Sequence, residues 1–128
     1  MITCEDIFNC GDVRELRRVA REYYVNNIAN TEVYNEEIGV VKFSKAGYKK
    51  PMSFGSDKRK LLVFPYLREI IKMGKIIKIE EERHGRGNID QWFLLEEKVN
   101  VNEIILTVRV NIREDNSGKL YYDHYILR

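Results

Sequence analysis

The sequence predicts an α+β fold in which N-terminal helices pack on one face of a mainly antiparallel, roughly four-stranded meander sheet. Two observations lead to this prediction. Apolar residues recur at helical three- and four-residue steps in the first part of the chain, and from Lys75 onward the spacing changes to the two-residue alternation of strands. The later segments are joined by short connections rich in Gly, Asn and Asp, which permit antiparallel neighbours but not parallel crossovers.

The chain has 128 residues, which fits a single domain spanning 1–128, with residues 1–11 expected to be irregular or flexible. Apolar residues make up 44%, with eight Tyr and five Phe, so the low hydrophobicity of a disordered chain is missing. The net charge is only +2, built from many charges of both signs. Total charge therefore gives no case for nucleic acid, and a basic site must be local.

Cys4 and Cys10 are the two cysteines, and neither lies in a CxxC motif or near a His at metal-ligand spacing. We expect free thiols, no metal and no cofactor. The N-terminus lacks the basic and apolar regions of a signal peptide, and no apolar run approaches the roughly 20 residues of a membrane span. These features predict a cytoplasmic protein without a membrane partner.

The first predicted helix begins at Asp12, whose carboxylate can accept from free N–H groups, and Glu15 favours the positive end of the helix dipole. Apolar residues at helical steps continue this helix to about Ala29. Residues 31–34 and 38–43 are rich in β-branched and aromatic side chains and predict a strand pair.

A second helical pattern follows the loop at 44–56. It is interrupted by Pro65, which removes a backbone donor, so we expect two short helices with Pro65 in the first turn of the second. Gly74 is expected to end that helix. Four strands then follow at 75–82, 90–99, 103–113 and 120–127.

The connection at 115–118 decides which face of the last strand carries His124. A two- or four-residue hairpin would place Arg109 opposite His124 and gather a polar cluster on one face. A three-residue loop with a bulge at Gly118 would instead put His124 on the face of Val108 and Val110, as a core histidine.

Several segments carry a resemblance to a known family; they are IGV (38–40), FSKAGYKK (43–50), VRV (108–110) and YYDH (121–124). In these segments and in element order, the chain resembles phage- and mobile-element-associated domains of the barnase–EndoU–colicin–RelE-like ribonuclease superfamily, especially the type found inside large polyvalent phage proteins. The resemblance covers roughly residues 29–127.

The resemblance implies a fold with helices first and a four-stranded antiparallel sheet after them. It also implies RNA cleavage without a metal. The residues that the resemblance assigns to the site are Lys50, Arg109, Tyr122 and His124.

Metal-independent RNA cleavage needs groups that transfer protons and cations that meet the phosphate. His124 suits the first role, although a histidine between aromatic residues is often structural. Arg109 suits the second, and its ordinary alternative is a salt bridge with Asp123 or Glu97.

Two local groups of basic residues are candidate nucleic-acid contacts. Lys45, Lys49 and Lys50 surround Gly47 and Tyr48, although lysines in a loop are commonly just solvated. Arg83 and His84 form the second group, in a connection whose glycines also suit an ordinary turn.

The leading hypothesis is therefore a phage-derived RNase-like domain that binds RNA and cleaves it by metal-independent transesterification. In it Lys50 and Arg109 bind phosphate, while His124, helped by Tyr122, transfers protons. One alternative is a non-catalytic binding or accessory module of a phage or mobile-element protein. Another is a tyrosine-rich surface for a protein partner or inhibitor.

Overall fold

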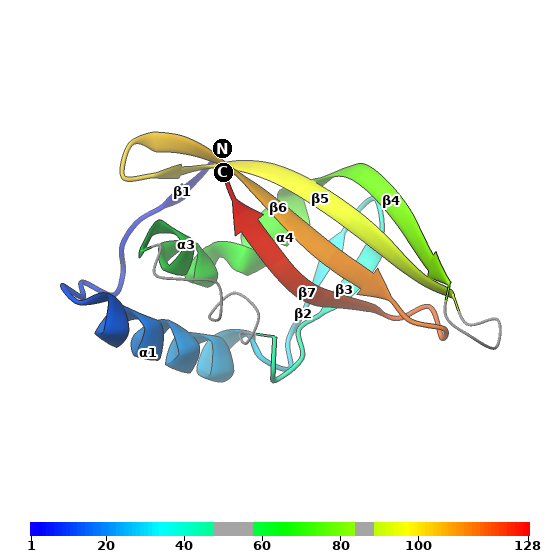
Figure 1. The fold of residues 1–128 in the computed structure, drawn as a ribbon, viewed down its shortest axis with the longest axis horizontal. Helices are drawn as coiled ribbons and strands as arrows, with labels where there is room; N and C mark the ends of the chain where they lie inside the picture. Colours follow the sequence, from blue (N-terminus) through cyan, green and yellow to red (C-terminus); the bar gives the residue numbers. More distant parts are fainter. Residues whose placement is uncertain (48–57, 84–88) are drawn as a thin grey trace.

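The computed structural model describes residues 1–47, 58–83 and 89–128 and shows a curled mixed sheet with helices packed against one of its faces (Figure 1). The predicted candidates Lys49, Lys50 and His84 lie outside the described residues. Along the chain come β1 (Ile2–Cys4), α1 (Val13–Tyr23), the π-helical turn η1 (Tyr24–Ile28), β2 (Glu32–Asn35), β3 (Gly39–Lys42), α3 (Lys58–Val63), the 3-10 turn η2 (Phe64–Tyr66), α4 (Leu67–Met73), β4 (Lys75–Arg83), β5 (Ile89–Val101), β6 (Ile104–Glu114) and β7 (Leu120–Leu127).

The sheet has seven strands in the order β1-β5-β6-β7-β3-β2, with β4 beside β5. The meander β4-β5-β6-β7 is antiparallel, as predicted, but β1 pairs in parallel with β5 and β3 in parallel with β7. The long strand β5 holds two neighbours on one edge, β4 along Ile89–Glu96 and β1 along Val99–Val101.

The predicted fold class is therefore wrong. A four-stranded antiparallel meander was expected, whereas the sheet is mixed and seven-stranded, because the hairpin β2–β3 and the N-terminal β1 join it. The helices are not all N-terminal either, since α3 and α4 come between the hairpin and β4. Part of residues 1–11, expected to be irregular or flexible, forms β1. Both parallel pairings join strands that are far apart in sequence. The prediction relied on short connections between consecutive strands, and such connections carry no information about these pairs.

Several local expectations are confirmed. Asp12 caps α1, its Oδ1 accepting from the Arg14 N–H at 3.1 Å. Two short helices are separated at Pro65 as expected, but Pro65 lies in the 3-10 turn η2 between them and not in the first turn of the second helix. Gly74 ends α4 as expected, with an ordinary φ of −63°. Glycine suits this position because a Cβ there would lie only 3.0 Å from the Ile70 carbonyl oxygen.

The core lies between the inner face of the sheet and the helices. Phe64 stands edge-on to Tyr24 and Tyr125, with ring centroids 6.0 and 5.6 Å apart. Val110 and Ile112 of β6 reach the same core, and all five side chains are fully buried. Burial of this size supplies most of the favourable free energy of folding.

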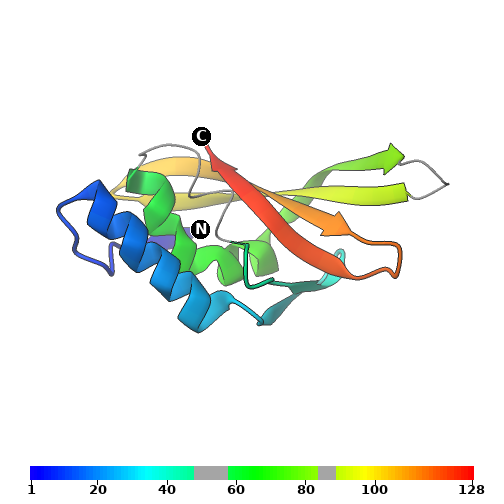
Figure 2. The ribbon, with the colours of Figure 1, turned by 60° about the horizontal axis from the view of Figure 1, so that its bottom comes forward.

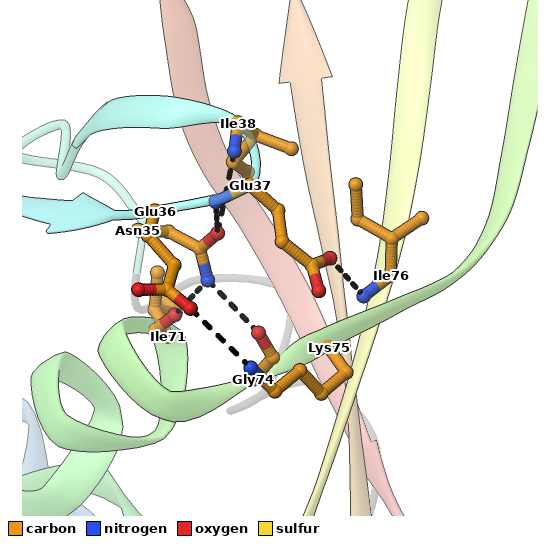
Figure 3. A network of polar contacts seen from close by, with 8 residues as sticks. All are labelled: Asn35, Glu36, Glu37, Ile38, Ile71, Gly74, Lys75 and Ile76. Atoms are coloured by element: carbon orange, nitrogen blue, oxygen red, sulfur yellow. Dashed lines mark hydrogen bonds and ion pairs between the residues drawn. The ribbon is translucent and has the colours of Figure 1, made fainter.

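Asn35 fixes the hairpin β2–β3 to the junction of α4 and β4 (Figure 3). Its Nδ2 donates to the carbonyl oxygens of Ile71 (2.7 Å) and Gly74 (2.9 Å), and its Oδ1 accepts from the N–H groups of Glu37 (2.9 Å) and Ile38 (3.3 Å). We call this set of contacts the Asn35 clasp.

The Glu37 carboxylate extends the clasp. Its Oε2 accepts from the N–H of Ile76 in β4 at 2.8 Å. The clasp thus joins the hairpin, at one end of the sheet order, to β4, which lies at the other side (Figure 3).

None of the helices in the described part of the chain has the length and apolar character that crossing a membrane requires.

Candidate functional site

The turn between β6 and β7 sets the register of the last strand. The Asp115 carboxylate accepts from the N–H and hydroxyl of Ser117 (2.9 and 2.7 Å) and from the Lys119 N–H (3.0 Å), and the Ser117 hydroxyl contributes most to lowering its pKa. Gly118 has a φ of +84°, a conformation that glycine adopts without strain. The turn pairs Ile112 with Tyr122, which directs Tyr122 into the core.

A β-bulge then changes the register one residue later. Ile112 pairs with Tyr122, but Asn111 pairs with His124, so Asp123 is the extra residue. Asp123 and His124 therefore both leave the core face, although consecutive residues of a regular strand point to opposite faces. The sequence left two arrangements open, and the structure combines features of both. The strand begins in the register expected for a loop with a bulge at Gly118, in which Ile112 pairs with Tyr122. The second bulge, at Asp123, then returns His124 to the polar face with Arg109 and Asn111.

The bulge lets Asp123 contact the imidazole of its own neighbour. Asp123 Oδ2 lies 2.6 Å from His124 Nδ1, and Asn111 Nδ2 lies 2.9 Å from His124 Nε2. With the Asn111 amide nitrogen donating, the ring carries its proton on Nδ1 and donates it to Asp123. The two side chains are partly shielded, 27% exposed for His124 and 19% for Asp123. This arrangement orients an imidazole at the surface.

His124 opens onto a hollow of about 370 Å³, which we call the His124 hollow. Its lining consists of Glu80, Glu81, Trp92, Asn111 and His124. The Lys78 Nζ lies 2.5 Å from Glu80 Oε1. The hollow thus combines an imidazole, carboxylates, an amide and an indole ring, a set that can exchange protons and hold a planar ring.

A row of directly paired residues crosses the outer face of the sheet beside His124. The pairs are Lys42 with Tyr121, Tyr121 with Arg113, Arg113 with Trp92, and Trp92 with Glu80. Paired residues share a face, so the cross-sheet row alternates cations and aromatic rings from β3 to β5 and ends at a carboxylate on β4. Lys42, Tyr121 and Trp92 are half-buried, and Arg113 is exposed.

The other end of the cross-sheet row meets a second hollow of about 400 Å³, the Lys45 hollow. Lys42, Lys45 and Tyr121 line it together with Asn30, Thr31, Glu32, Phe43 and Ser44. The outer face therefore offers a path from two lysines, over aromatic rings, to His124.

The structure does not bring all the predicted site residues together. Tyr122 lies on the opposite face from His124, buried against Phe43 with ring centroids 5.4 Å apart. Its hydroxyl has no hydrogen-bond partner among the described residues, and burial raises its pKa well above the usual value. Tyr122 is therefore a core residue that does not reach the imidazole of His124.

Arg109 shares the face of His124, and its Nε lies 3.1 Å from Glu96 Oε2. A salt bridge was the expected alternative for Arg109, but with Asp123 or Glu97 and not with Glu96. Lys45 lies exposed at the Lys45 hollow. Arg83 is the last residue of β4.

Sequence reasoning missed the aromatic part of the site, because Trp92 and Tyr121 come to lie on either side of Arg113 only through the pairing of β5, β6 and β7. One signal in the sequence could have revealed the bulge. Two polar residues, Asp123 and His124, separate Tyr122 from Tyr125, so a regular strand with its period of two cannot place both tyrosines on the core face.

The two cysteines stay outside the site. Cys4 and Cys10 are free and buried. Burial, with a smaller contribution from Glu69, raises the pKa of Cys4 to about 12, so its thiol is protonated at neutral pH. Among the described residues no three His, Cys, Asp or Glu side chains are grouped so that they could hold a metal ion.

A comparison with known families finds a match over most of the chain. The family model described as large polyvalent protein-associated domain 3 matches residues 11–125. No curated protein and no solved structure matches the chain. The match supports the part of the resemblance that concerns large polyvalent proteins, and the ribonuclease superfamily is not part of it.

Proposed function

The chain belongs to the large polyvalent protein-associated domain 3 family, and we propose that, as a module of such a protein, it binds RNA across the outer face of its sheet and cleaves it at the His124 hollow. The single observation that carries this proposal is the cross-sheet row of Lys42, Tyr121, Arg113 and Trp92 leading to the Asp123–His124 pair. Cations and rings in alternation match the phosphates and bases of a single strand.

The binding step favours single-stranded RNA, because its bases are free to stack on aromatic side chains whereas those of a double helix are stacked on one another. Unstacked bases lie on Tyr121 and Trp92, and each such contact contributes about 1–3 kcal/mol in known single-strand binders. Lys42 and Arg113 meet the backbone phosphates, and Lys45 extends the basic end of the path. Lys49 and Lys50 follow Lys45 closely in sequence and add to the same electrostatic attraction in this proposal.

The chemical step is an internal transesterification. A base takes the proton of a 2′-hydroxyl, the 2′-oxygen attacks the neighbouring phosphorus, the bond to the 5′-oxygen breaks, and an acid gives that oxygen a proton. His124 transfers one proton while Asp123 orients its ring. Glu80 is the carboxylate of the His124 hollow that transfers the other, and Arg109, on the same face as His124, contacts the phosphate.

A second candidate is a binding module without catalysis. Both ring nitrogens of His124 already lie within hydrogen-bond distance of Asn111 and Asp123. Glu80 and Glu81 also make the His124 hollow acidic, which opposes a phosphate there. In this alternative the outer face still binds RNA, and His124 only holds the side chains of Asn111 and Asp123 in place.

The test incubates the chain with a labelled single-stranded RNA in the presence of a metal chelator. Wild type is expected to produce ends with 2′,3′-cyclic phosphate. His124→Gln should lower the cleavage rate by about 100-fold or more, because a proton-transfer group is lost. Its Kd should stay within about threefold of wild type, since the row is untouched.

Tyr121→Ala and Trp92→Ala should each weaken RNA binding by about tenfold, because a stacking surface is lost. Tyr34→Ala is the matched control, since Tyr34 is an exposed tyrosine on β2, outside the row. Binding without cleavage by wild type would leave the non-catalytic module. RNA that stays unbound would contradict both candidates.

A further inference from the structure

The outer edge of β4 is open along most of its length. In the part of the chain that the structure describes, β4 pairs only with β5. At its beginning the Ile76 N–H is occupied by Glu37, and Ile77 is the extra residue of a β-bulge, so the regular open part starts at Lys78. Figures 1 and 2 both show β4 at the rim of the molecule, extending away from the helices. Unpaired backbone groups at such an edge can pair with a strand of another chain.

Charges of opposite sign flank Ile79 in the open part of this edge. Lys78 precedes Ile79, Glu80 and Glu81 follow it, and Arg83 ends the strand. A second β4 placed in parallel would oppose like charges. An antiparallel second copy centred on Ile79 would oppose Lys78 with Glu80, so the open part of the strand is complementary to itself in that direction.

Exposed apolar side chains lie at the centre of the same edge. Ile77 is 45% exposed and Ile79 is 51% exposed. In a pairing centred on Ile79, this residue faces its own copy, and Lys78 of each chain faces Glu80 of the other. Lys78 and Glu80 already form an ion pair within the chain, so two copies would make an alternating square of four charges.

We propose that two copies of this chain associate through antiparallel pairing of their β4 edges about a two-fold axis at Ile79. Such an interface is isologous and closes after two copies. The proposal concerns association alone and is tested without RNA, so it stands or falls independently of the RNA proposal.

Sedimentation velocity over a range of concentrations measures this association. Wild type is expected to rise reversibly from the mass of one chain to twice that mass. Ile79→Lys should keep the single-chain mass, because two like charges would meet on the axis. Ile105→Lys is the matched control: Ile105 is 59% exposed on β6, and its substitution should leave the dimer unchanged.

A charge exchange tests the direction of pairing. Lys78→Glu alone should shift the equilibrium toward the single chain, and Lys78→Glu combined with Glu80→Lys should restore the dimer. Ile79→Cys should form a symmetric disulfide-linked dimer on oxidation, whereas the native Cys4 and Cys10 are buried. Circular dichroism of each variant verifies that it is folded.

The proposal is overturned if wild type keeps the mass of one chain at every concentration, or if folded Ile79→Lys dimerises like wild type. It is also overturned if the charge exchange leaves Lys78→Glu unrescued while Ile79→Cys fails to crosslink.

Discussion

At the scale of single residues, Asp123 shapes the candidate site directly. As the extra residue of the bulge, it lies beside His124 on the outer face, with its carboxylate 2.6 Å from the imidazole. Bulges commonly redirect side chains in this way next to functional sites. The ladder on either side of the bulge keeps Tyr122 and Tyr125 in the core.

Deletion of Asp123 should therefore be tolerated. Without it, β7 forms a regular ladder with Tyr122, His124 and Tyr125 facing as before, so the free energy of unfolding should change by only about 1 kcal/mol. Deletion of Arg109 is the control, because Arg109 lies in a regular part of β6 and its loss would reverse the faces of the residues beyond it. Urea unfolding measures both. Equal destabilisation by the two deletions would contradict the assigned bulge.

At the scale of elements, the Asn35 clasp holds the hairpin β2–β3 against the end of α4. Asn35 is 1% exposed, and its amide satisfies two carbonyl groups and two N–H groups (Figure 3). The hairpin also supplies β3, the parallel neighbour of β7, and Lys42 at one end of the cross-sheet row. The clasp thus positions part of the candidate RNA surface.

Asn35→Ala should lower the free energy of unfolding by about 3 kcal/mol, because buried backbone groups lose their partners. Asn27→Ala is the control, since Asn27 is exposed and its Nδ2 makes one 3.2 Å contact with the Tyr23 carbonyl. A change within about 0.5 kcal/mol is expected there. Thermal or urea unfolding of both variants checks the difference. A loss below about 1 kcal/mol for Asn35→Ala would show that the clasp does not hold the hairpin.

At the scale of the whole molecule, we propose that residues 1–128 unfold as a single domain. The core connects helices, hairpin and meander, and β1 and β3 add long-range pairings to the sheet. The chain contains one tryptophan, Trp92, on β5 far from α1 in sequence. Its fluorescence and far-UV circular dichroism should give coincident urea curves.

A second reporter tests the helical side. Phe8 packs on Tyr23 of α1 with ring centroids 5.8 Å apart, so Phe8→Trp combined with Trp92→Phe moves the fluorescent probe there. Its midpoint should agree with that of circular dichroism recorded on the same variant. Separate midpoints for the two sides would indicate that one side opens before the other, and would contradict a single cooperative unit.

The sequence by itself determined the features that depend on neighbours along the chain. Helical and strand periods placed α1, the pair α3 and α4, and the strands β4 to β7 within a few residues, and Asp12 and Pro65 marked helix boundaries. These signals are local, since a period or a cap needs only a few consecutive residues.

Only the tertiary structure decided the number of strands in the sheet and the composition of the outer face. The parallel pairs of Ile2 with Val99 and of Val41 with Leu120 join distant segments whose contact no local pattern encodes. The face of His124 depends on two successive register changes, the Gly118 turn and the Asp123 bulge. Each register change alone would move His124 to the other face of the sheet. The face of His124 is therefore settled by the burial of Tyr122 and Tyr125 in a core that exists only once the chain is folded.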